Sequence, residues 1–106
     1  MDLNDYQALA RSTAIYPDQH RVVYPALGLA GESGEVAEKI KKMLRDDIPE
    51  ETVRESLVKE LGDVLWYVAN LAHDLSITLD EVAHANVSKL LDRSERGVLQ
   101  GSGDNR

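Results

Sequence analysis

The sequence contains no cysteine and no phenylalanine, and it has one tryptophan and three prolines among its 106 residues. Without cysteine, the chain cannot form a disulfide framework, use a thiolate nucleophile or build a cysteine-based zinc site. It has no run of about 18 apolar residues, so we expect no membrane-spanning helix. The acidic start, with Asp2 and Asp5, also argues against a signal peptide. We therefore expect a cytoplasmic protein.

Positive charge is scarce as well. Lysine and arginine number 12 against 19 aspartates and glutamates, which gives a formal net charge of −7. This excess of negative charge argues against binding to nucleic acid or to a membrane surface. It does not exclude a small polyphosphate substrate, because bound cations can reverse the local charge. The length fits one domain with a modest core.

The apolar residues that are present are mostly leucine, valine and alanine, which favour packed helices over a β-sandwich. Helical spacing predicts an all-α, four-helix domain over residues 1–96, followed by a C-terminal tail over 97–106. The helices are expected over residues 2–15, 22–45, 47–75 and 78–96. We predict N-caps at Asp2, at Asp47 with Glu50, and at Thr78 with Glu81.

Two pairs of acidic residues stand out on the second and third predicted helices. Glu32 and Glu35 are three residues apart, and so are Glu60 and Asp63. At about 100° per residue, each pair occupies one narrow face of its helix. Both faces border the apolar stripe that the helix should bury, so an antiparallel hairpin would bring all four carboxylates into one partly dry groove. A single pair of this kind is usually a solvated face, whereas two such pairs favour a functional site.

Four carboxylates held together would repel one another, which would raise their pKa values. A positive ion between them would remove that penalty. Oxygen ligands of this type suit Mg²⁺ or Mn²⁺. Because protein-bound Mg²⁺ keeps waters that phosphate oxygens can replace, a phosphate ester or anhydride is the expected substrate.

Three glycines interrupt the second predicted helix: Gly28, Gly31 and Gly34. Each costs up to about 1 kcal/mol relative to alanine in a helix. This spacing predicts the close approach of another backbone or of a ligand, and Gly28 falls on the face that carries Glu32 and Glu35.

Two segments, 28–39 and 60–67, resemble the MazG family of nucleoside triphosphate pyrophosphohydrolases. They read GLAGESGEVAEK and ELGDVLWY, an ExxE and an ExxD motif whose glutamates Glu35 and Glu60 are separated by 24 residues. The stretch 80–90, with Arg93, resembles the family too. The resemblance implies an all-α fold assembled as a dimer or tetramer. It also implies Mg²⁺-dependent hydrolysis of nucleoside triphosphates to the monophosphate and pyrophosphate, which removes unwanted nucleotides.

By this resemblance, Glu32, Glu35, Glu60 and Asp63 would ligate the metal, and Glu32 or Glu35 would serve as general base. Other side chains are candidates for contacts with the substrate: Lys39, Tyr67, Asn86, Lys89 and Arg93. The alternative for Lys39 is an ordinary ion pair with Glu35, four residues away. The alternative for the three residues on the last helix is a solvated polar face.

Aromatic residues suggest where the base of a nucleotide would lie. Tyr67 is expected to face the acidic groove, whereas Trp66, rotated by about 100°, should pack against another helix or subunit. Several residues of the first helix and the loop after it are candidates for base contacts: Tyr6, Gln7, Tyr16, His20 and Tyr24.

The third predicted helix is apolar over much of its circumference, so a subunit interface is expected. The tail sequence GSGDNR at 101–106 resembles tails of MazG-like proteins. We therefore expect it to be ordered over a site rather than frayed.

Two alternatives remain open at this point. The chain could be a dUTPase-like or phosphoribosyl-ATP pyrophosphohydrolase relative, although Gly62 with Trp66 and Tyr67 resembles MazG more closely than the latter. It could also be a non-catalytic helical interaction module, against which the intact acidic pairs argue. The phosphate-binding pattern GxxxxGK[ST] is absent, so a kinase or nucleotide-driven motor is not supported.

Overall fold

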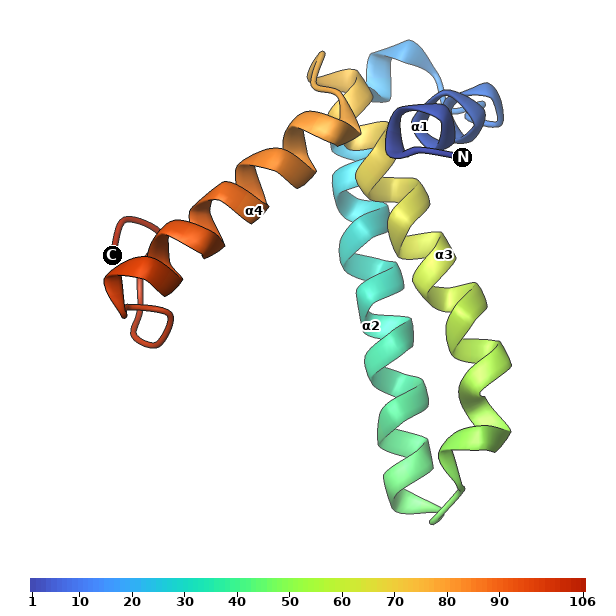
Figure 1. The fold of residues 1–106 in the computed structure, drawn as a ribbon. Helices are drawn as coiled ribbons and strands as arrows, with labels where there is room; N and C mark the ends of the chain where they lie inside the picture. The colour runs from blue at the N-terminus through green and yellow to red at the C-terminus, as the bar shows by residue number, and fades with distance from the viewer.

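The computed structural model describes all residues, 1–106, and contains four α-helices, one short 3-10 helix and no strand (Figure 1). The elements are α1 (Leu3–Ser12), η1 (Asp18–His20), α2 (Val23–Arg45), α3 (Glu50–Asp74) and α4 (Leu79–Arg96). The predicted all-α, four-helix architecture is confirmed. The short helix η1 lies between the first and second predicted helices.

Helices α2 and α3 form a long antiparallel hairpin (Figure 1). The prediction that Asp47 caps α3 is wrong, because Pro49 occupies the N-cap position and no side chain caps the helix. Asp47 instead adopts a left-handed conformation, with φ at 51°, inside the tight loop. Proline at the cap has a fixed φ, here −62°, that leads directly into the helix.

The other two predicted caps are confirmed. Asp2 accepts a hydrogen bond from the backbone N–H of Asp5 at 2.8 Å, and Thr78 accepts one from that of Glu81 at 3.1 Å. Both form reciprocal capping boxes. These caps fix where α1 and α4 begin, and hence where each helix meets α3.

The small core lies where α1 and the start of α4 meet the C-terminal half of α3. Ala10, Ala69 and Leu79 are buried there, and Trp66 is among the partly buried residues packed against them. The buried side chain of Gln7 ties the three helices together. Its amide donates to the carbonyls of Ala69 and Ile77, and its oxygen accepts from the N–H of Leu79.

Helix α4 leaves this junction and projects away from the hairpin, and the tail folds back near its far end (Figure 1). The radius of gyration is 16.5 Å, against about 13 Å for a compact chain of this length. Apolar side chains consequently remain exposed on α3 and α4: Val58, Leu61, Leu65, Val87, Leu90 and Leu91. None of the helices has a stretch long and apolar enough to cross a membrane.

Candidate functional site

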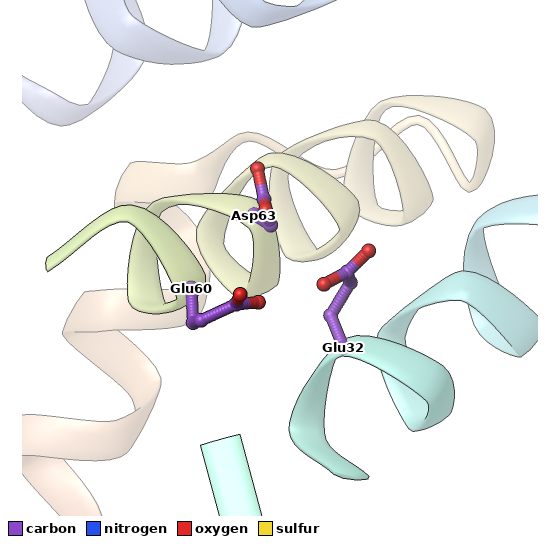
Figure 2. Close-up of side chains that lie close together, drawn as sticks. All are labelled: Glu32, Glu60 and Asp63. Atoms are coloured by element: carbon purple, nitrogen blue, oxygen red, sulfur yellow. The ribbon is translucent and has the colours of Figure 1, made fainter. Parts of the chain in front are cut away.

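Three carboxylates gather between the two long helices. Glu32 on α2 and Glu60 and Asp63 on α3 each offer an oxygen within 4.8 Å of the others. Figure 2 shows the carboxyl groups of Glu32 and Glu60 pointing toward one another from opposite helices, with Asp63 one turn along α3. The antiparallel hairpin therefore brings two motifs that are distant in sequence into one acidic cluster.

The acidic cluster is electrostatically strained. Partial burial raises the pKa of Glu32, and the charges of Asp63 and Glu60, with a smaller contribution from Glu35, raise it further. One cation lies nearby: Lys39 Nζ is 3.7 Å from Glu60 Oε1. Three carboxylates facing one lysine carry surplus negative charge, and their oxygen donors fit a hard divalent cation.

Glu35 is not among the three gathered carboxylates, so the expected convergence of all four is not found. It is exposed and lies about 4.5 Å further along α2 than Glu32. The alternative interpretation of Lys39, an ion pair with Glu35, is not found either. Lys39 reaches across the hairpin to Glu60 instead.

A cavity of about 310 Å³ opens beside the acidic cluster and is lined by Glu32, Asp63, Trp66 and Tyr67. Burial raises the pKa of Tyr67, and the neighbouring Tyr24, Glu32 and Asp63 raise it further. Tyr67 thus faces the acidic groove, as the helical spacing predicted.

Trp66 lines the same cavity, so its expected separation from Tyr67 is wrong. The two rings make an edge-to-face contact with centroids 5.0 Å apart, because large side chains bridge the 100° between successive helical positions. The expectation that Trp66 packs against another helix is confirmed. Its indole N–H donates to Thr13 Oγ1 at 2.8 Å, beside α1.

Gly28 makes the close approach that its helix position suggested, but the neighbour is a side chain. A Cβ at Gly28 would lie 2.1 Å from Tyr67 Cε1, closer than any real contact. At Gly31 and Gly34 the same Cβ would meet nothing within 4 Å. Close approach of a neighbouring group therefore explains only Gly28, and the neighbouring group is the Tyr67 ring.

The remaining candidates lie on α4, away from the acidic cluster of the same chain (Figure 1). Asn86 is exposed, Lys89 is half-buried and Arg93 is buried. The tail covers the two cations, since Asp104 Oδ1 is 3.1 Å from Lys89 Nζ and 3.3 Å from an Arg93 guanidinium nitrogen. The same Arg93 nitrogen donates to the Asp104 carbonyl at 2.6 Å.

The tail is ordered rather than frayed. Arg106 donates to the carbonyls of Val98, Leu99 and Gly103, which closes the tail into a loop. The surface that it covers is the cationic pair Lys89 and Arg93, not the carboxylates of its own chain.

Among the proposed base contacts, burial and the charge of Asp63 raise the pKa of Tyr6. Tyr16 and Tyr24 are connected to the cavity through Tyr67. They stack with centroids 4.8 Å apart, and Tyr24 lies 6.3 Å from Tyr67. Gln7 has both ends of its amide engaged in the core, and His20 is exposed.

Asp74 binds side chains of α1 and of the loop that follows it, and the sequence did not predict this role. It accepts hydrogen bonds from Arg11, 63 residues away, and from Tyr16, 58 residues away. A single aspartate at the end of a helix has no spacing pattern that would reveal such partners.

A larger hollow of about 550 Å³ lies toward the α2–α3 loop. Six of its nine lining residues are hydrophobic, and it includes none of the clustered carboxylates. It is an apolar groove on the hairpin, distinct in character from the acidic cavity.

Comparison with known proteins places this geometry in a family. The sequence model of the MazG nucleotide pyrophosphohydrolase domain matches residues 25–98, which include both acidic motifs and α4. The chain is 48% identical to the Gene 37 protein of Mycobacterium phage L5 over the full length of both proteins. No solved structure matches.

Proposed function

This chain belongs to the MazG nucleotide pyrophosphohydrolase family, and on that premise we propose that it hydrolyses nucleoside triphosphates to the monophosphate and pyrophosphate. The observation that carries the proposal is the gathering of Glu32, Glu60 and Asp63 from two helices beside an aromatic cavity. In the cytoplasm the protein would act on (deoxy)nucleoside triphosphates and so remove unwanted nucleotides.

The acidic cluster would hold Mg²⁺, or Mn²⁺, through Glu32, Glu60 and Asp63, with Glu35 joining after a change of its side-chain rotamer. When bound, the ion would neutralise the phosphates and the leaving pyrophosphate and would make a water more acidic. Like charges already raise the pKa of Glu32, so ion binding relieves a repulsion that is present in the folded chain.

The chain's own residues would orient the substrate and move one proton. Glu32 or Glu35 would take a proton from the water that attacks a phosphorus, as the bond to the leaving pyrophosphate breaks. Lys39, 3.7 Å from Glu60, would contact a phosphate oxygen at the edge of the acidic cluster. Tyr67 would contact the nucleoside from the wall of the cavity.

Asn86, Lys89 and Arg93 would bind phosphates in a site completed by a second copy. Within one chain α4 projects away from the acidic cluster, and apolar side chains stay exposed on α3 and α4 (Figure 1). A homodimer or homotetramer would bury those side chains and could carry α4 of one copy to the carboxylates of another. The proposed catalytic unit is this assembly of residues 1–96.

The direct test is an assay of pyrophosphate and orthophosphate release from each ribo- and deoxyribonucleoside triphosphate, including dUTP, with Mg²⁺ and with a chelator. We expect pyrophosphate release that the chelator abolishes. Glu32→Gln and Asp63→Asn should each lower kcat by about 100-fold or more, because each removes a charged metal ligand. Glu55→Gln, which removes an exposed carboxylate elsewhere on α3, is the matched control.

A second readout does not depend on turnover. Mg²⁺ at ten times its dissociation constant should stabilise the wild-type protein by about 1.4 kcal/mol, and Glu32→Gln should reduce this response. The absence of metal-dependent pyrophosphate release from any nucleotide would leave a non-catalytic module as the better interpretation. Orthophosphate release would contradict the proposed reaction type.

A further inference from the structure

Asp74, the last residue of α3, is a buried carboxylate that the proposed reaction does not use. Its side chain is 2% exposed, yet it makes three hydrogen bonds. It accepts from Arg11 Nη1 at 3.0 Å, from the Tyr16 hydroxyl at 2.7 Å and from the backbone N–H of Val22 at 2.9 Å. One carboxylate thus joins α1, the loop over residues 13–22 and the end of α3.

The loop needs this anchor because its backbone is strained. Val22 has φ at 67° and ψ at −56°, a positive-φ conformation that a β-branched residue rarely adopts. Such a conformation persists only when its surroundings impose it. The hydrogen bond from Val22 N–H to Asp74 holds the strained residue, and Arg21 donates to the Asp74 carbonyl beside it.

The loop over residues 13–22, anchored at Asp74, holds the ring of Tyr16 against the ring of Tyr24. Tyr16, held by its hydroxyl on Asp74, stacks on Tyr24 with an interplanar angle of 25°. Tyr24 contacts Tyr67, which lines the cavity together with Glu32 and Asp63. A continuous line of contacts therefore runs from Asp74 to the wall of the cavity.

We propose that Asp74 is a positioning residue that holds the stacked pair Tyr16 and Tyr24 beside Tyr67, so that the three rings form a platform for the aromatic base of the nucleotide. This inference rests on the proposed function, because it assumes that the phosphates lie at the acidic cluster. Stacked aromatic faces bind bases of any identity through their π-surfaces. Asp74 acts through Tyr16 and does not touch the substrate.

The test separates base recognition from phosphate recognition. Asp74→Asn keeps the shape of the side chain but removes its charge, which weakens the hold on Arg11 and Tyr16. We expect the KM for the best nucleoside triphosphate to rise about tenfold. The kcat, and the inhibition constant of inorganic tripolyphosphate, which has no base, should stay within about twofold, because Asp74 is not part of the acidic cluster.

The control is Asp46→Asn, which breaks the exposed ion pair with Arg45 at the other end of α2 and should change none of these constants. Equal changes in nucleotide and tripolyphosphate binding by Asp74→Asn would overturn the proposal, because they would indicate general damage to the fold. If Asp74→Asn does not fold, Tyr16→Phe keeps the ring and removes only the hydroxyl. It should raise the nucleotide KM, although less than Tyr16→Ala does, and a KM unchanged from wild type in Tyr16→Phe would contradict the anchoring role.

Failure of the proposed function can be told apart from failure of this inference. If the wild-type protein releases no pyrophosphate, calorimetry with a non-hydrolysable nucleoside triphosphate and with tripolyphosphate still measures the contribution of the base. Loss of nucleotide affinity alone in Asp74→Asn would support the positioning role without turnover. Unchanged nucleotide affinity would refute it.

Discussion

Gly28 illustrates how a single residue controls the position of a cavity wall. The Tyr67 ring lies so close to it that a Cβ would overlap Cε1. Gly28→Ala must therefore displace the ring, which costs about 1–3 kcal/mol. This cost outweighs the gain of roughly 1 kcal/mol that alanine brings in helix propensity. We expect a lower free energy of unfolding in urea and weaker nucleotide binding.

Gly31→Ala is the matched control, because its Cβ would enter open space on the same helix. It should raise the free energy of unfolding by about 0.5–1 kcal/mol, since only the backbone entropy changes. Equal effects of the two substitutions would show that the Tyr67 ring does not depend on the missing Cβ at Gly28.

Asp74 should also govern stability in acid. Burial works to raise its pKa, but the Val22 N–H, the Tyr16 hydroxyl and the charge of Arg11 outweigh burial and lower it. A lowered folded-state pKa means that the carboxylate stabilises the fold above its unfolded value of about 3.9 and loses that effect as pH falls through the lower folded value.

Asp74→Asn should accordingly cost about 2–3 kcal/mol at pH 7, the range for hydrogen bonds to a charged group. The difference from wild type, measured by urea unfolding at several pH values, should shrink below about pH 4, where the Asp74 carboxylate of the unfolded state binds a proton before that of the folded state does. A difference that stays constant down to pH 3 would show that the carboxylate charge is not what stabilises this network.

The positions of some site residues could be predicted from the sequence, and those of others could not. The three-residue spacing of Glu60 and Asp63 was enough to place both on one face, because helix geometry is regular. It could not place Glu35, whose distance from the others depends on how the two helices are offset along their axes. It also misjudged Trp66, because angular position ignores how far a large side chain reaches.

The same contrast appears among the helices. The starts of α1 and α4 could be predicted because Asp2 and Thr78 bond to backbone groups only three residues away. The start of α3 was misplaced because Pro49 and Asp47 both favour a helix start and only the loop geometry decides between them. The direction of α4 could not be predicted, since its apolar face has no partner within the chain that would fix it.

The tail on α4 gives a prediction about phosphate binding. Lys89 and Arg93 lower the pKa of Asp104, which keeps an exposed carboxylate charged where a phosphate would be expected. Asp104→Asn removes this competing anion and should tighten the binding of inorganic tripolyphosphate by about threefold, a size typical of one exposed ion pair. Fluorescence or calorimetric titration in low salt would measure it.

Asp92→Asn is the control, because it makes the same change of charge on α4 at the ion pair with Arg96. It should leave tripolyphosphate affinity close to that of wild type. Weaker binding by Asp104→Asn would indicate that the tail orders the two cations for phosphate rather than competing with it.

At the scale of the whole molecule, the single chain has a small buried core. Nine of its 106 residues are buried, and only four of those belong to the hydrophobic core. The apolar circumference of α3 was visible in the sequence, so an interface could be predicted. The exposure of Val87, Leu90 and Leu91 on α4 could not be predicted, because it depends on the direction in which α4 leaves the junction.

We expect the protein in solution to have a molar mass that is a multiple of its 11.8 kDa chain. Leu91, 62% exposed on α4, and its neighbour Val87, 52% exposed, would lie in the interface. Leu91→Glu places a charge that would have to be desolvated on assembly, so it should shift the sedimentation equilibrium toward the 11.8 kDa species. Because α4 carries Lys89 and Arg93 to a second copy in the proposed site, pyrophosphate release should fall in parallel.

The control for this change is Ser88→Glu, which adds the same charge at an exposed position of α4 that is rotated by about 100° from both Val87 and Lys89. It should leave the assembly intact, and far-ultraviolet circular dichroism should show that both variants remain helical. A wild-type protein that sediments as a single chain at micromolar concentration would contradict the shared site. An active Leu91→Glu monomer would show instead that each chain completes its own site, with α4 folded back onto its own hairpin.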